Sequence, residues 1–157
     1  MLKKLMFTLT IAVLSLLLMS VVSSAAPASL PATVSTSGNI ITVTNPPSFS
    51  TTTNKGVVFC GYGESNTKLY FYEYNSSNNT YRPIYENGEH VSLTINSSGV
   101  FWKKINFAAG YHKVVVYAES GNSVQSVKRE INVITSDIVD RIKGLSVNVN
   151  GLIRKGI

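Results

Sequence analysis

Short apolar runs separated by turn residues fill the chain from residue 39 to residue 134. Within the runs, side chains of one kind recur with a period of two, which is the period of a β-strand with two different faces. Asn-Pro-Pro at 45–47 and Asn87-Gly88 are among the turn signals. We therefore expect strands over residues 40–43, 57–61, 68–74, 81–85, 90–95, 100–107, 111–119 and 124–133.

Strands at this regular spacing, with almost no helical periodicity, predict an all-β sandwich of seven or eight antiparallel strands. Pro83 lacks a backbone N–H, so it marks the strand at 81–85 as an edge strand. In the strand at 111–119 the alternation predicts two faces, with Val114, Val116 and Ala118 on one and Val115 and Tyr117 on the other.

The N-terminus has the order of a secretory signal peptide: Lys3 and Lys4, then an uncharged apolar stretch at 5–22, then small residues. Two small-x-small cleavage sites are present, Ser23-Ser24-Ala25 and Ala26-Pro27-Ala28, and we expect the second to be used. An uncleaved membrane anchor is the alternative. The expected organisation is a signal peptide at 1–28, a linker at 29–38, the sandwich at 39–134 and a C-terminal tail at 135–157.

The tail differs from the strand pattern of residues 39–134. Ser136 and Asp137 are typical of a helix start, and the pattern predicts a short amphipathic helix over 137–143. Apolar residues recur along it at spacings of four and three, a heptad-like seam. The seam consists of Ile138, Ile142, Leu145, Val149 and Leu152. It can pack on the sandwich, pair with another chain or lie on a membrane, and a protein contact is the leading expectation.

Charge and cysteine content narrow the partner classes. The formal net charge of +6, less the two charges of Lys3 and Lys4, is +4, and the basic residues are scattered. A nucleic-acid partner is not expected, because its surface needs a denser basic stripe. The single cysteine, Cys60, excludes an internal disulfide, and its apolar run at 57–61 predicts a buried small hydrophobe. Membrane contact is expected only through the signal peptide before cleavage.

Candidate chemistry is sparse. The two histidines, His90 and His112, lie on different predicted strands without a neighbouring cysteine or second histidine, so no metal site is predicted. Glu86 and Glu89 flank a turn that we interpret as a solvated loop rather than a calcium site. No nucleophile elbow, phosphate loop or dinucleotide fingerprint is present. The sequence thus predicts a protein without catalytic residues or cofactor.

Aromatic residues give the first candidate surface. If Leu69 and Phe71 face the core, the alternation places Tyr70, Tyr72 and Tyr74 on the opposite face. By the same rule Trp102 and Lys104 point outward, because Phe101, Ile105 and Phe107 point inward. Such a set can stack on sugar rings or dock a protein. The alternative is that the tyrosines only cover neighbouring side chains.

Several short motifs of residues 45 to 134 resemble bacterial immunoglobulin-like modules, especially the type similar to the domain-B module of glucodextranase. They are Pro47-Ser48, Thr51-Thr52-Thr53, Val58-x-Cys60-Gly61, Leu69-x-Phe71, Ser98-Gly99-Val100-Phe101, Ile105-x-Phe107, Gly110-x-His112-x-Val114-x-Val116-x-Ala118 and Arg129-x-Ile131-x-Val133. His112 stands where the pattern usually has Asn, and the insert from Tyr74 to His90 is longer than in the simplest modules. The resemblance implies an immunoglobulin-like fold and a spacer, adhesin or accessory role, without catalytic residues.

Together these features predict a secreted, non-catalytic module, released or held at the cell envelope. Its expected role is protein interaction at the cell surface or in the extracellular matrix, with a protein partner or by self-association. A carbohydrate-binding module that uses Trp102 and the tyrosines on a cell-wall glycan is the alternative.

Overall fold

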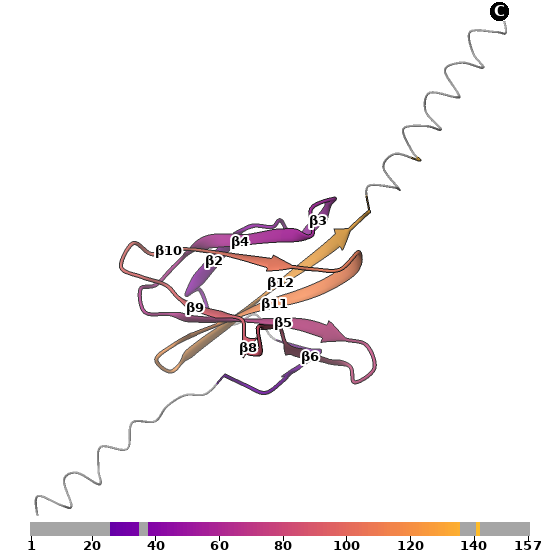
Figure 1. The fold of residues 1–157 in the computed structure, drawn as a ribbon. Helices are drawn as coiled ribbons and strands as arrows, with labels where there is room; N and C mark the ends of the chain where they lie inside the picture. The colour runs from indigo at the N-terminus through magenta and orange to yellow at the C-terminus, as the bar shows by residue number, and fades with distance from the viewer. Residues whose placement is uncertain (1–25, 35–37, 136–140, 142–157) are drawn as a thin grey trace, which may run out of the picture.

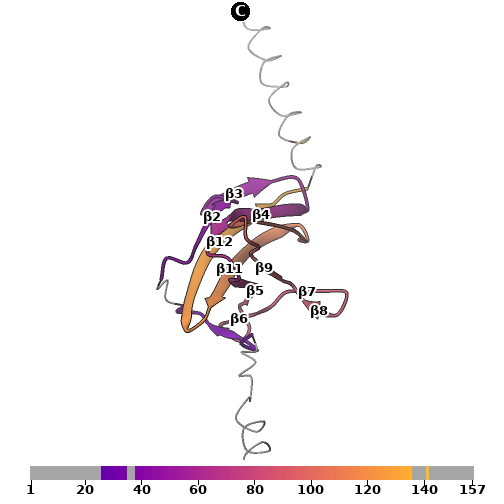
Figure 2. The same ribbon diagram turned by 90° about the vertical axis from the view of Figure 1, so that its left-hand side faces the viewer.

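The computed structural model describes residues 26–34, 38–135 and 141, and this part of the chain is a β-sandwich of two facing sheets with a small hairpin (Figure 1). The larger sheet has the order β1 (Leu30–Pro31), β6 (Thr80–Pro83), β5 (Lys68–Asn75), β11 (Gly110–Ser120), β12 (Ser123–Val133) and β3 (Phe49–Thr52), and β9 (Ser92–Thr94) also pairs with β5. The smaller sheet has the order β10 (Val100–Asn106), β4 (Gly56–Gly63) and β2 (Ile41–Asn45). The hairpin of β7 (Tyr85–Glu86) and β8 (Glu89–His90) projects from the side of the sandwich (Figure 2).

The predicted all-β sandwich is confirmed, and each predicted strand coincides with an observed one or with a group of shorter ones. The two segments between residues 80 and 95 are divided, because the hairpin β7–β8 interrupts the edge of the larger sheet. Two strands were not predicted, β1 and β3. β3 pairs with β12 in parallel, from Phe49 opposite Glu130 to Thr52 opposite Val133, whereas the other strand pairs of the described residues are antiparallel.

The main core lies between the two sheets and follows the predicted alternation. Leu69 and Phe71 of β5 are fully buried in it, and the rings of Phe71 and Phe59 meet edge to face at 5.4 Å. Val114, Val116 and Ala118 of β11 face this core, as predicted, while Val115 and Tyr117 face the opposite side of the larger sheet. A second, smaller cluster therefore lies on the outer side of that sheet, formed by Leu30, Tyr72, Tyr81 and Val115.

Residues of the predicted linker contribute to this second cluster. Leu30 pairs with Tyr81 and Pro31 with Thr80, and the Leu30 side chain is buried. The prediction that the strand at 81–85 is an edge strand is therefore wrong at its beginning, because β1 hydrogen-bonds to the side of β6 that does not pair with β5. The alternation within β6 contains no information on a partner strand about fifty residues earlier in the chain.

The predicted amphipathic tail lies outside the described residues, with the exception of Arg141. Its seam residues Ile138, Ile142, Leu145, Val149 and Leu152 thus remain a sequence-based prediction. Within the described ranges, no helix is long and apolar enough to span a bilayer.

Candidate binding surface

The outer face of the smaller sheet carries exposed apolar and aromatic side chains. In β4 the inward positions are Val57, Phe59 and Gly61, of which Phe59 is fully buried in the core. The intervening residues Val58 and Tyr62 therefore point to solvent. The core thus fixes the orientation of the exposed residues, since a shift of one position would put Phe59 in water.

The antiparallel register with β10 adds the second half of this face. Trp102 lies directly opposite Cys60, Val100 opposite Tyr62, and Lys104 opposite Val58. Side chains directly opposite each other on one face are about 5 Å apart at their Cβ atoms. We call the set of Val58, Cys60, Tyr62, Val100, Trp102 and Lys104 the Trp102 face.

Trp102 is the most exposed large hydrophobic residue in the described part of the chain, at 72%. Val100 and Tyr62 are also more than half exposed, at 59% and 56%. The outward orientation predicted for Trp102 and Lys104 is confirmed. An exposed tryptophan surrounded by valine and tyrosine on a rigid sheet is an unfavourable surface in water, because apolar area remains solvated.

A hollow of about 350 Å³ adjoins Tyr62 at one end of the Trp102 face. Asn39 to Thr42 of the β2 segment form one side, and Tyr62, Gly63 and Glu64 form the other. The Glu64 carboxylate accepts a hydrogen bond from Ser120 Oγ at 3.3 Å. The face therefore offers a flat aromatic platform next to a concave, partly polar site of side-chain size.

Lys104 places a positive charge at the end of the Trp102 face that lies away from Tyr62. Lys104 lies along Gly56, where an added Cβ would be 2.1 Å from Lys104 Cε, so its side chain extends away from Trp102. The neighbouring Lys103 points the other way, and its ammonium lies 3.1 Å from the Glu86 carboxylate. Lys104 is thus the cation that borders the apolar centre of this face.

The prediction of an exposed tyrosine stripe at Tyr70, Tyr72 and Tyr74 is wrong. The three side chains do lie on the face opposite Leu69 and Phe71, but Tyr72 is fully buried and the other two are partly buried. Leu30 of β1 and His90 of β8 cover this surface. The ring centroid of His90 lies 4.9 Å from that of Tyr72. We call this covered surface the tyrosine face; it comprises Tyr70, Tyr72, Tyr74, Tyr81, Tyr117 and Val115.

Burial has a measurable consequence for the Tyr72 phenol. Loss of hydration on burial raises its pKa well above the ordinary value of 10.0, and the neighbouring Tyr117, Tyr70, Glu119 and Tyr85 add to this effect. The hydroxyl therefore stays neutral and donates a hydrogen bond of 2.7 Å to the backbone carbonyl of Pro27.

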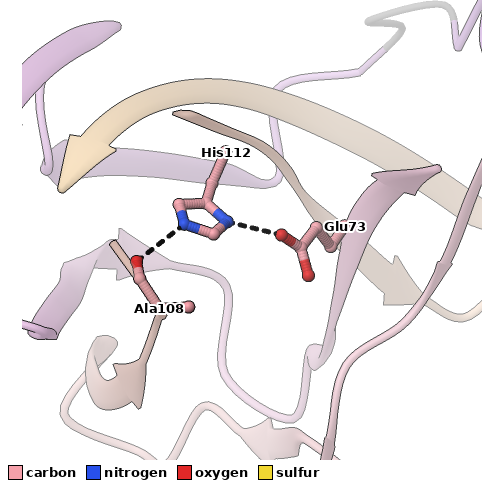
Figure 3. Close-up of polar contacts among 3 residues, drawn as sticks. All are labelled: Glu73, Ala108 and His112. Atoms are coloured by element: carbon pink, nitrogen blue, oxygen red, sulfur yellow. Dashed lines mark hydrogen bonds and ion pairs between the residues drawn. The ribbon is translucent and has the colours of Figure 1, made fainter. Parts of the chain in front are cut away.

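His112 and Glu73 form a pair that resembles part of a catalytic triad (Figure 3). The His112 Nδ1 lies 2.6 Å from Glu73 Oε1, and its Nε2 lies 3.0 Å from the carbonyl oxygen of Ala108. The ring is thus held between a carboxylate oxygen on β5 and a backbone carbonyl oxygen in the loop before β11. The backbone carbonyl of Ala108 occupies the position that a nucleophile has in a triad. The arrangement fits a clamp between β5, β11 and the loop before β11.

A hollow of about 210 Å³ lies beside the turn between β7 and β8. Its lining includes Glu86, Glu89, His90 and Lys103. The Glu86 carboxylate is paired with the Lys103 ammonium at 3.1 Å, so a positive charge already lies beside the oxygen that a calcium ion would need. Among the described residues, no three His, Cys, Asp or Glu side chains gather into a metal-binding group.

Cys60 is not the buried hydrophobe that its apolar run predicted. It is partly exposed and opposite Trp102, because β4 alternates and Val57 and Phe59 take the inward positions. Val58, Tyr62 and Val100 were also not predicted as surface residues of this face. Their alternation was readable in the sequence, but only the pairing register of β4 with β10 places them beside Trp102.

Compared with models of known protein families, the chain matches none, and it matches none of the curated proteins. What the chain does is therefore inferred from its fold and its surface.

Proposed function

We propose that this chain is a secreted, non-catalytic immunoglobulin-like module that binds a protein partner through the Trp102 face. The observation that carries the proposal is the concentration of exposed Val58, Tyr62, Val100 and Trp102 on one side of one sheet. Tryptophan and tyrosine are over-represented among residues that dominate binding energy, and a rigid sheet presents them without a large ordering cost.

The strand order supports the immunoglobulin-like part of the proposal. In such a domain the first, second and fifth strands share a sheet, and the sixth lies between the third and the seventh in the other. Here β2, β4 and β10 form the smaller sheet in that relation, and β11 lies between β5 and β12. The chain passes from the smaller to the larger sheet between β2 and β3.

Export is supported by the sequence pattern of residues 1–28, with its positive start, apolar centre and small residues. A module at the cell surface or in the matrix would meet its partner there. Lys104 at the border of the Trp102 face favours a partner surface with an acidic residue next to an apolar patch.

A protein partner is favoured over a sugar by the side chains around the indole. Sugar hydroxyl groups need hydrogen-bond partners, whereas three of the five neighbours of Trp102 on this face are Cys60, Val58 and Val100; Tyr62 and Lys104 lie at its two ends. Apolar and aromatic neighbours at the centre with charge at the border are typical of protein interfaces. The second candidate, stacking on a cell-wall glycan, is favoured by one observation, the 72% exposure of Trp102.

The test is capture of the chain by envelope material from the cells that produce it, measured by biolayer interferometry. We expect binding to an envelope protein fraction that is lost after protease digestion and weakened at least about tenfold by Trp102→Ala. The matched control is Phe49→Ala, which removes an aromatic side chain of 61% exposure from the other sheet.

Three outcomes oppose the proposal. Binding that survives protease digestion and is reproduced by purified wall polymers would support the glycan alternative. Equal weakening by Phe49→Ala would remove the Trp102 face as the site. Absence of binding, together with a monomer in light scattering, would contradict both an outside partner and a second copy of the chain.

A further inference from the structure

The segment Ala26–Val34, here called the N-terminal strap, is part of the folded domain. Its β1 residues pair with β6, and Figure 1 shows this indigo segment beside β6 at the base of the larger sheet. Leu30 is buried against Tyr72, Tyr81 and Val115, and Val34 packs against the same cluster. The strap therefore provides apolar cover for the tyrosine face.

The strap has a second anchor nearer to its beginning. The Tyr72 hydroxyl donates to the Pro27 carbonyl at 2.7 Å, and Ala26 and Pro27 are partly buried. Between the two anchors, Ala28 and Ser29 are exposed. A buried phenol that loses its acceptor retains the cost of desolvation without a partner, so the contact with Pro27 is the one that shortening of the strap would affect first.

The two small-x-small motifs differ in what they do to this anchor. Hydrolysis after Ala28 removes Ala26 and Pro27 and leaves a charged amino group at Ser29, next to the buried Leu30. Hydrolysis after Ala25 leaves both anchors and places the new amino group at the start of the strap. The sequence pattern alone favours the later site, whereas the contacts of the strap favour the earlier one.

We propose that the signal peptide is removed between Ala25 and Ala26, so that the mature protein begins with Ala26 and retains the complete strap. The reaction adds one water molecule across that peptide bond and gives a carboxylate on Ala25 and an amino group on Ala26. The co-reactant is water, and the catalyst is the signal peptidase of the exporting cell. The inference rests on the proposed export and not on the Trp102 face.

The first experiment is expression of the full chain in an exporting host, followed by N-terminal sequencing and intact-mass measurement of the secreted protein. We expect Ala26 as the first residue. A chain that begins with Ser29 overturns the inference, and so does a chain that keeps Met1. An uncleaved chain also contradicts export as proposed, whereas a start at Ser29 leaves export and the Trp102 face intact.

Two matched variants of the full chain test the site directly. Ala25→Leu places a large side chain at the residue before the proposed scissile bond, and Ala28→Leu does the same at the alternative bond. We expect Ala28→Leu to be processed like the wild type, because Ala28 is the third residue after the proposed bond, and to fold normally, because Ala28 is exposed. Ala25→Leu is expected to accumulate precursor or to be cut after Ala28. The reverse pattern overturns the inference.

Thermal unfolding of the secreted products provides a readout that does not depend on processing rate. The product of Ala25→Leu that starts at Ser29 is expected to melt about 3–6 °C below a product that starts at Ala26. In a Tyr72→Phe background the difference is expected to shrink, because the donor to Pro27 is then absent. Equal melting temperatures in the Tyr72 background would show that Pro27 is not an anchor.

Discussion

The side chain of Gln125 makes hydrogen bonds to both the backbone N–H and the backbone carbonyl of Ile41, as a neighbouring strand would. Gln125 lies on β12 of the larger sheet and Ile41 on β2, at the edge of the smaller one. The Ile41 N–H donates to Gln125 Oε1 at 2.8 Å, and Gln125 Nε2 donates to the Ile41 carbonyl at 3.0 Å. Arg129 lies four residues further along β12, on the same face. It donates to the carbonyls of Val43 and Pro46 at 2.6 and 2.7 Å. β12 thus satisfies the open edge of β2 and joins the two sheets.

Replacement of Gln125 by leucine is expected to lower the free energy of unfolding by about 2–4 kcal/mol, because two buried backbone groups of Ile41 lose their partners. Urea denaturation followed by far-UV circular dichroism measures the change. Ser123→Ala, at an exposed position of the same strand, is the control and should stay within about 0.5 kcal/mol of the wild type. A loss of less than about 1 kcal/mol for Gln125→Leu would show that water replaces these bonds.

The tyrosine face predicts a loss of stability at alkaline pH. Burial raises the pKa of Tyr72 above its ordinary value of 10.0, and burial also raises the pKa of Tyr70, Tyr81 and Tyr117. A group whose pKa is raised in the folded state contributes stability that is complete below about pH 10. That stability is lost as the pH rises toward the folded value, because the unfolded chain ionises first.

The check is the free energy of unfolding measured by urea denaturation between pH 8 and pH 11. We expect it to fall above about pH 10, and we expect Tyr72→Phe to reduce the slope there by up to about 1.4 kcal/mol per pH unit. Tyr85→Phe, at an exposed position, serves as the matched control. An unchanged slope in Tyr72→Phe would mean that Tyr72 is accessible to hydroxide in the folded state.

Cys60 makes the Trp102 face accessible to a chemical probe, since it is the single cysteine of the chain and lies opposite Trp102. We expect a maleimide to label it in the folded protein, because the side chain is partly exposed. Trp102→Ala is expected to increase the labelling rate several-fold by removing the indole beside the thiol. Mass spectrometry over time measures the rate, and a bound partner on this face should slow it. Labelling that occurs only in denaturant would contradict the exposed placement.

Trp102→Ala is also expected to leave the fold intact. The indole is 72% exposed, so its removal should change the free energy of unfolding by no more than about 0.5 kcal/mol. The substitution Phe59→Ala on the inner face of the same sheet is expected to cost about 3–5 kcal/mol, because this ring is fully buried. Similar losses for both would mean that Trp102 has a structural rather than a binding role.

The local sequence pattern was sufficient to predict whether a side chain points inward or outward within a single strand. The inward positions of Leu69, Phe71 and Val116, and the outward position of Trp102, follow from the period of two, since successive side chains of a strand point to opposite faces. β3 was missed because its sequence, Phe49–Thr52, has no buried residue and is held in place by pairing with β12.

The period-two pattern predicts every strand except β1 and β3, and it predicts the face on which most of their side chains lie. Which outer face stays open depends on how distant segments pack. Tyr72 and Trp102 both point away from the core, but β1 and His90 cover the tyrosine, whereas Trp102 stays 72% exposed. The physical reason is that side-chain direction is a local property of the backbone, whereas burial depends on segments far apart in the chain that pack together.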